Sequence, residues 1–115
     1  MNLSIKRVKN SLIVDVKGEL DLKTADKFEE KIKEIISKGF RKVIFNFNEV
    51  EFIDSSGIGA LLSIYKFLVK NDGVMVITNI SPRIRRVLEV AGVLRIIDVY
   101  ASQKEAVEKL AGGGE

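Results

Sequence analysis

The order of apolar and polar residues predicts extended structure at the start of the chain, followed by a helix. Residues 3–17 alternate between apolar and polar side chains, which is the period of a strand, and the Asn10-Ser11 pair interrupts them. This pattern predicts two short antiparallel strands joined by a tight turn, with Gly18 ending the second strand. Residues 24–38 instead carry apolar side chains at helical spacing, and Gly39 stops this helix at its C-terminal end.

Strands and helices then alternate along the rest of the chain. The apolar runs predict strands over 42–47, 74–77 and 95–99. They also predict helices from near Ser55 to the turn at 71–73, from Ser81 or Pro82 to 91 and from 102 to 110. The order β-β-α-β-α-β-α-β-α predicts an α/β fold with a mixed, mainly parallel sheet and helices packed against it. No linker or internal repeat divides the chain, so we expect one domain over residues 1–111 and a disordered tail over residues 112–115.

Length and composition agree with one globular domain. The chain has 115 residues, of which 46% are hydrophobic and 30% are charged. Its N-terminus is charged and alternating, so we expect no signal peptide. The longest uncharged stretch, residues 55–65, is far too short to span a bilayer. These features predict a cytoplasmic protein without a membrane span.

The absence of two residue types restricts the chemistry. The chain has no cysteine and no histidine, which excludes disulfides, thiolate nucleophiles, Ser-His pairs and metals ligated by His or Cys. An enzyme would still be possible with carboxylates, lysines, hydroxyls or backbone groups, but we expect no metal, no cofactor and no catalytic residue. The net charge is only +3, with six Phe, two Tyr and no Trp, which does not favour nucleic-acid binding. The basic run Arg83, Arg85 and Arg86 is interpreted as a solvated helix face or as part of a docking site for an acidic partner.

The segment Asp54-Ser55-Ser56-Gly57-Ile58-Gly59 carries the most chemical information in the chain. Its first three residues are types that cap helix N-termini, and they stand directly before an apolar helix. Gly57 and Gly59 lower helix propensity but permit close approach of another backbone. One interpretation is that Asp54 or Ser55 caps the helix and that the glycines let it pack on the sheet. The other is that the helix N-terminus is a functional surface, where unshielded amides favour an anion and an exposed serine receives a phosphate.

A second polar turn follows the second predicted strand. Gly18-Glu19-Leu20-Asp21 lies between that strand and the first helix, and Asp21 or Thr24 is a candidate N-cap of this helix. The alternative places the Asp21 carboxylate near Ser55, as part of a surface that docks a partner. The Walker, dinucleotide-binding and Gly-x-Ser-x-Gly spacings do not occur in the sequence.

Taken together, these residues resemble the anti-sigma factor antagonists that consist of a single STAS domain. The resemblance spans nearly the whole chain and rests on Gly18–Asp21, on Phe52–Gly59 and on Ile80-Ser81-Pro82 before a basic helix. It implies a STAS-like fold and a binding protein rather than an enzyme. In this family the unphosphorylated antagonist binds an anti-sigma factor that is also a serine kinase, and it thereby frees a sigma factor.

The resemblance also implies which residues form the switch. The kinase phosphorylates the serine that follows the Asp of the motif, which is Ser55 in this chain, with Ser56 as the adjacent competitor. The phosphate releases the antagonist, and a metal-dependent serine phosphatase reverses the reaction. The implied partner-binding residues are Asp21, Asp54, Ser55, Ser56, Gly57 and Gly59.

Two other functions stay open at this point. STAS domains also occur in phospholipid-transport assemblies, where the chain would be a constitutive binding module and its serines only helix caps. A hydrolase or nucleotide-binding enzyme would have to use the carboxylates of Asp21 and Asp54. The second alternative predicts turnover or nucleotide binding by the isolated chain.

Overall fold

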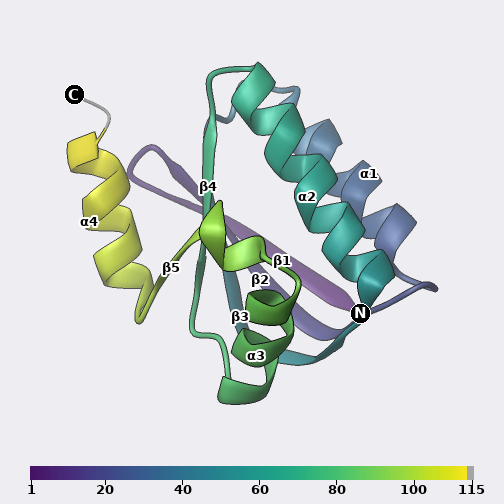
Figure 1. Ribbon diagram of the computed structural model, residues 1–115. Helices are drawn as coiled ribbons and strands as arrows, with labels where there is room; N and C mark the ends of the chain where they lie inside the picture. The colour runs from purple at the N-terminus through teal and green to yellow at the C-terminus, as the bar shows by residue number, and fades with distance from the viewer. Residues whose placement is uncertain (114–115) are drawn as a thin grey trace.

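Five strands and four α-helices make up the computed structural model, which describes residues 1–113. In chain order the elements are β1 (Asn2–Val8), β2 (Ser11–Leu20), α1 (Ala25–Ile36), β3 (Lys42–Ile53), α2 (Ser55–Lys70), β4 (Val74–Thr78), α3 (Pro82–Val90), the 3-10 helix η1 (Val93–Arg95), β5 (Asp98–Tyr100) and α4 (Gln103–Gly113). The strands lie side by side in this same order, with β1 and β2 antiparallel and the other neighbours parallel (Figure 1). The predicted α/β fold with a mixed, mainly parallel sheet is confirmed.

The helices cover the two faces of the sheet unequally. Right-handed crossovers between successive neighbouring strands place their helices on one face, and α1, α2 and α3 accordingly share a single large core. This core holds three phenylalanines. The ring centroid of Phe45 lies 5.7 Å from that of Phe28 and 6.2 Å from that of Phe47. Helix α4 follows the last strand and lies on the other face (Figure 1). It covers a smaller cluster made of Ile13, Ile44, Val76, Ala106, Val107 and Leu110.

Strands β2 and β3 are both longer than the sequence predicts. Gly18 does not end β2, because the strand passes through it with a φ of +107° and continues to Leu20. The register of the two strands shifts between Gly18 and Glu19, which marks a bulge. Strand β3 runs on to Ile53, which pairs with Leu20. The two strands therefore end together, and the turns that follow them emerge at the same edge of the sheet.

The C-terminal part differs from the prediction in the position of its last strand. Gly92, with a φ of +81°, turns the chain after α3 into η1, where the amides of Ile96 and Ile97 donate to the carbonyl of Val93. Strand β5 is therefore only three residues long and begins at Asp98. Helix α4 extends through Gly113 and so includes the first half of the predicted tail, whereas residues 114 and 115 lie outside the described residues. None of the described helices combines the length and apolar character needed to cross a membrane.

Candidate functional site

Asp54 connects the start of α2 to the neighbouring turn. It is the only residue between β3 and α2, and its extended backbone places the side chain over the first turn of the helix. Its Oδ1 accepts hydrogen bonds from the amides of Ser56 and Gly57, at 2.9 and 3.1 Å. Its Oδ2 accepts one from the amide of Leu22, at 3.3 Å. Of the two caps that the sequence allows, Asp54 and Ser55, the structure uses Asp54. The same side chain also links the two turns that follow β2 and β3.

Asp21 organises the turn between β2 and α1. Its Oδ1 accepts hydrogen bonds from the amides of Lys23 and Thr24, at 3.0 and 3.2 Å. Thr24 is the N-cap residue of α1, but its side chain makes no capping bond, so the polar contact comes from Asp21. Because Leu22 bonds to Asp54, the Asp21 turn lies against the start of α2. Both carboxylates are thus acceptors for backbone amides, which is the use expected of caps.

The two serines of the motif differ in accessibility. Ser55 is the first residue of α2 and is exposed, whereas Ser56 is half-buried. The amides of the first turn are not unshielded, contrary to the sequence-based expectation, because those of Ser56 and Gly57 donate to the Asp54 carboxylate. The amide of Ile58 donates to the carbonyl of Asp54. The helix N-terminus is therefore already occupied by a carboxylate, and a phosphate on Ser55 would stand beside that negative charge.

The two glycines of the motif have different surroundings. Gly57 is buried, and a Cβ atom there would overlap the carbonyl oxygen of Leu20 and lie 2.9 Å from Cγ1 of Ile53. Gly59 is exposed, and a Cβ atom there would meet no other group of the described chain within 4 Å. The fold therefore requires a glycine at Gly57 but gives no reason for one at Gly59.

Two large apolar side chains are exposed on the segments that meet at this edge. Leu22, directly after Asp21, is 77% exposed, and Phe52, two residues before Asp54, is 48% exposed. The sequence analysis did not predict that either side chain is exposed, because an apolar residue in or next to a strand is normally assigned to the core. The one signal was the position of Leu22 outside both the strand alternation and the helical stripe. We name Leu22, Ser55, Ser56 and Gly59 the Ser55 surface, since Leu22 is fastened to the start of α2.

Comparison with known proteins places the chain in a family. The family model described as the STAS domain matches residues 2–106. The chain belongs to the STAS domain family. The anti-sigma F factor antagonist of Paenibacillus polymyxa is 30% identical to it over 96% of this chain and 97% of that protein.

Solved structures similar to this STAS domain include antagonists in two states. The structure of the anti-sigma factor antagonist SpoIIAA in its unphosphorylated form has a TM-score of 0.76 at 26% identity and covers 96% of this chain and 99% of that chain. The phosphorylated form of Bacillus SpoIIAA has a TM-score of 0.73, also at 26% identity, with 95% of this chain and 99% of that chain covered. A candidate anti-sigma factor antagonist of Thermotoga maritima has a TM-score of 0.89 at 26% identity, over 93% and 92% of the two chains.

Another serine of α2 in this STAS domain has a structural role. Ser63 lies on the side of α2 that faces α1, where its hydroxyl donates to Oε2 of Glu29 at 2.6 Å. The ammonium of Lys33 donates to the same carboxylate and to Ser63, both at 2.7 Å, and lies 5.7 Å from the ring centre of Phe67. The hydrogen bonds from Lys33 and Ser63 lower the pKa of Glu29 below its ordinary value. This cluster joins α1 to α2. The hydroxyl of Ser63 is therefore already hydrogen-bonded within the chain, whereas Ser55 is exposed.

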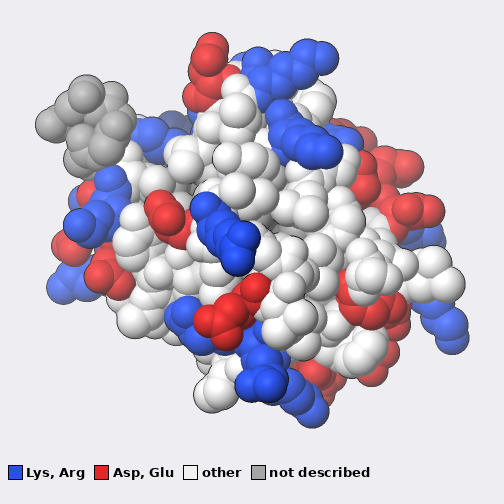
Figure 2. Space-filling view, in the orientation of Figure 1, with Lys and Arg blue, Asp and Glu red and all other residues white. Residues whose placement is uncertain are grey.

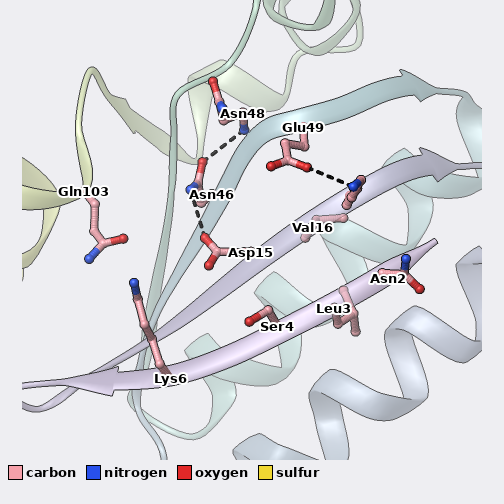
Figure 3. Close-up of a pocket in the computed structure, with 11 residues that line it drawn as sticks. Asn2, Leu3, Ser4, Lys6, Asp15, Val16, Asn46, Asn48, Glu49 and Gln103 are labelled. Carbon is pink, nitrogen blue, oxygen red and sulfur yellow. Dashed lines mark hydrogen bonds and ion pairs between the residues drawn. The ribbon is translucent and has the colours of Figure 1, made fainter.

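A polar hollow lies on the other face of this STAS domain, beside α4. It has a volume of about 430 Å³, and its lining includes Ser4, Lys6, Asp15, Asn46 and Gln103 (Figure 3). The amide of Asn46 donates to Asp15 at 2.8 Å. The hollow is the part of the sheet that α4 leaves uncovered, and polar side chains are usual on such a face. None of the predicted site residues lines it, and residues 1–113 contain no group of three or more acidic, His or Cys side chains that could hold a metal ion.

Replacing Asp54 with alanine is expected to destabilise the STAS domain by about 1–2 kcal/mol, because two amides of the first turn and the amide of Leu22 lose their acceptor. Urea unfolding followed by circular dichroism measures this loss. Asp54→Asn is the matched control, since its amide oxygen can still accept from Ser56 and Gly57, and it should lose less than half as much. Equal losses in the two variants would show that the charge of Asp54, and not the capping geometry, carries the effect.

Proposed function

We propose that this chain is an anti-sigma factor antagonist whose binding to its anti-sigma factor is switched off by a phosphate on Ser55. The observation that carries the proposal is the exposed serine at the first position of α2, next to the capping carboxylate of Asp54. The names of the relatives support the antagonist role, and the phosphorylated form of similar SpoIIAA supports a phosphate switch. The partners are an anti-sigma factor with serine kinase activity and a metal-dependent serine phosphatase, all in the cytoplasm.

The capped helix explains why such a switch needs no change of fold. The Asp54 carboxylate already holds the first-turn amides, so a phosphate on Ser55 takes no bond away from the helix. A phosphate carries about −1.5 to −2 charge near neutral pH. A partner that packs on the Ser55 surface would then have to desolvate this charge together with that of Asp54. The chain acts by binding alone, so it needs no catalytic residue of its own.

Leu22 and Gly59 supply contacts that fit a protein partner. Leu22 is 77% exposed beside Asp54, and burial of a leucine side chain favours binding by roughly 2 kcal/mol. Gly59 leaves the α2 backbone open to another chain one turn beyond Ser55. Half-buried Ser56 lies on the same turn and can contact the partner without being modified. These residues make up the proposed interface. Asp21 and Asp54 position them, and Gly57 lets α2 pack closely on the sheet.

Phosphate labelling by the anti-sigma kinase tests the switch. The purified chain, incubated with its cognate anti-sigma factor and ATP, is expected to gain one phosphate, located on Ser55 by mass spectrometry. Ser55→Ala should abolish labelling, whereas Ser56→Ala and the control Ser63→Ala should be labelled as the wild type is. A serine phosphatase of the metal-dependent class should remove the phosphate. Labelling of Ser55→Ala on Ser56 would overturn the assignment of the acceptor.

A pull-down from the source cells separates this function from a role in lipid transport. Antibodies against the chain are expected to recover an anti-sigma factor, and more of it with Ser55→Ala than with the phosphorylated wild type. Recovery of phospholipid-transporter subunits with no regulator of a sigma factor would contradict the proposal.

A further inference from the structure

The segment that includes α3 and η1 carries a net positive charge supplied by arginines alone. The chain has 19 basic and 16 acidic residues, which gives +3. Residues 83–95 contain four arginines, one glutamate and no lysine, which also gives +3, so the rest of the chain holds fifteen basic and fifteen acidic residues. The rest of the chain is therefore neutral in sum, although residues 6–9 and 38–42 are also locally basic. A single-sign region of this kind attracts partners of opposite charge from a distance.

The four arginines of this segment face solvent. Arg83, Arg85 and Arg86 are exposed on α3, whose opposite side buries Ile84 and Leu88 in the core. Arg95 is exposed on η1, which packs against α3. Figure 2 shows blue side chains, with red ones beside them, over the lower part of the molecule, where Figure 1 places α3. Within residues 1–113 the ion pairs are Lys17–Glu49 and Lys33–Glu29, so none of the four arginines forms one.

Two apolar side chains are exposed in this segment or directly after it. Val90, at the end of α3, is 80% exposed, and Ile96, directly after η1, is 49% exposed. Val90 lies four residues after Arg86 on α3 and Ile96 directly follows Arg95, so each aliphatic side chain neighbours an arginine. Exposed apolar groups bordered by arginine are typical of protein interfaces, where arginine is enriched and lysine is depleted. The guanidinium group also binds carboxylates in a bidentate geometry that lysine cannot match.

The composition of the segment favours a protein partner over nucleic acid or a membrane. Surfaces that bind single-stranded nucleic acid combine basic residues with aromatic side chains that stack on bases, and membrane-binding helices carry Trp, Phe or Leu on their apolar face. The exposed residues of this segment include no aromatic residue and no lysine. Arginines with small aliphatic side chains instead fit a helix or loop that carries carboxylates and a few apolar residues.

The segment adjoins the strand that leads to Ser55. The Nη2 atom of Arg83 donates to the carbonyl of Glu51, at 2.9 Å, and Glu51 lies three residues before Asp54 on the same strand and turn. We propose that an acidic segment of the anti-sigma factor docks on this arginine surface, so that one partner contacts both it and the Ser55 surface. The inference rests on the function proposed above. The arginine surface is made of Arg83, Arg85, Arg86, Val90, Arg95 and Ile96.

The two surfaces then contribute differently to binding. Exposed charges act over about 8 Å at physiological ionic strength and mainly raise the rate of association. The four arginines of the arginine surface therefore steer the anti-sigma factor toward the chain. The apolar side chains Val90 and Ile96 and the Ser55 surface, which would contact the partner directly, govern how long the complex lasts.

Association kinetics with the immobilised cognate anti-sigma factor test the arginine surface. The triple variant R83Q/R85Q/R86Q is expected to associate about tenfold more slowly than the wild type at 50 mM salt and to show little further loss at 300 mM. Val90→Ser should leave the association rate unchanged and speed dissociation about threefold to tenfold. The matched control K38Q/K104Q/K109Q removes the same three charges from exposed positions elsewhere and should associate within about twofold of the wild type.

The possible outcomes separate this surface from the function on which it rests. A wild-type chain that binds no anti-sigma factor overturns both proposals. Wild-type association by the arginine variant, or an equal slowing by the lysine control, overturns the arginine surface alone. The arginine surface is also overturned if the arginine variant associates normally but loses binding to duplex DNA or to phosphatidylglycerol vesicles. The surface would then serve one of those partners.

Discussion

Phosphorylation of Ser55 is expected to weaken binding of the anti-sigma factor at least a hundredfold, which corresponds to about 2.7 kcal/mol. The phosphate places about two negative charges on the first residue of α2, next to the Asp54 carboxylate. The amides of Ser56 and Gly57 donate to the Asp54 carboxylate and are therefore not available to the phosphate. The partner must therefore desolvate two adjacent like charges. Titration calorimetry with the fully phosphorylated and unmodified chains measures the difference.

Glutamate and alanine at Ser55 separate the effect of charge from that of the lost hydroxyl. Ser55→Glu should lower the affinity at least tenfold, and Ser55→Ala should stay within about threefold of the wild type. Ser4→Glu adds the same charge at an exposed serine of β1, in the hollow on the other face of the sheet, and should leave the affinity unchanged. An acidic residue in the first turn of a helix is favourable, so Ser55→Glu should unfold at the same temperature as the wild type or above it. Equal losses in Ser4→Glu and Ser55→Glu would contradict a local switch.

The start of α2 was predictable from the sequence because a helix cap is a local feature. Asp54 and Ser55 are capping types placed before an apolar run, and the structure puts the helix start between them. Thr24 and Asp21 were both candidates for the cap of α1. The sequence could not choose between them, since Thr24 occupies the N-cap position while Asp21 makes the side-chain bonds.

The features that the sequence could not predict all depend on contacts between distant segments. Gly18 reads as a strand end, but a bulge and pairing with β3 carry β2 past it to Leu20. Helix propensity treats Gly57 and Gly59 alike, and only the position of the Leu20 carbonyl makes them different. The exposure of Leu22 likewise follows from where the Asp54 side chain fastens its backbone. Such information lies in the pairing of β2 with β3 and not in any short window of residues.

The order of the strands, by contrast, follows from simple connection rules. After the first hairpin, each strand is joined to its parallel neighbour through one helix, and the consistent hand of such crossovers puts α1, α2 and α3 on one side. The carboxyl ends of β2 and β3 then share one edge, which is where β3 leads into Ser55 and where the Asp21 turn begins. The site thus occupies the edge at which parallel sheets commonly bind their ligands.

Replacing Gly57 with alanine is expected to destabilise the fold by about 3 kcal/mol or more. The added Cβ would overlap the carbonyl oxygen of Leu20 and press on Ile53, and both belong to paired strands that cannot move independently of the sheet. For a domain of this size the loss corresponds to a fall of at least about 10 °C in the unfolding temperature. Thermal unfolding followed by circular dichroism measures it, and wild-type stability of Gly57→Ala would contradict the close packing of α2 on β2.

Gly59→Ala is the matched variant, and it also tests why a glycine stands at this exposed position. Its Cβ meets no other group of the described chain within 4 Å, so the change should raise stability by up to about 1 kcal/mol through helix propensity. If the anti-sigma factor approaches the α2 backbone at Gly59, the same variant should bind it at least tenfold more weakly despite being more stable. Loss of binding with a gain in stability has no explanation within the chain itself, so it would assign Gly59 to the interface. Unchanged binding would instead exclude Gly59 from the contact and restrict the Ser55 surface to Leu22 and the two serines.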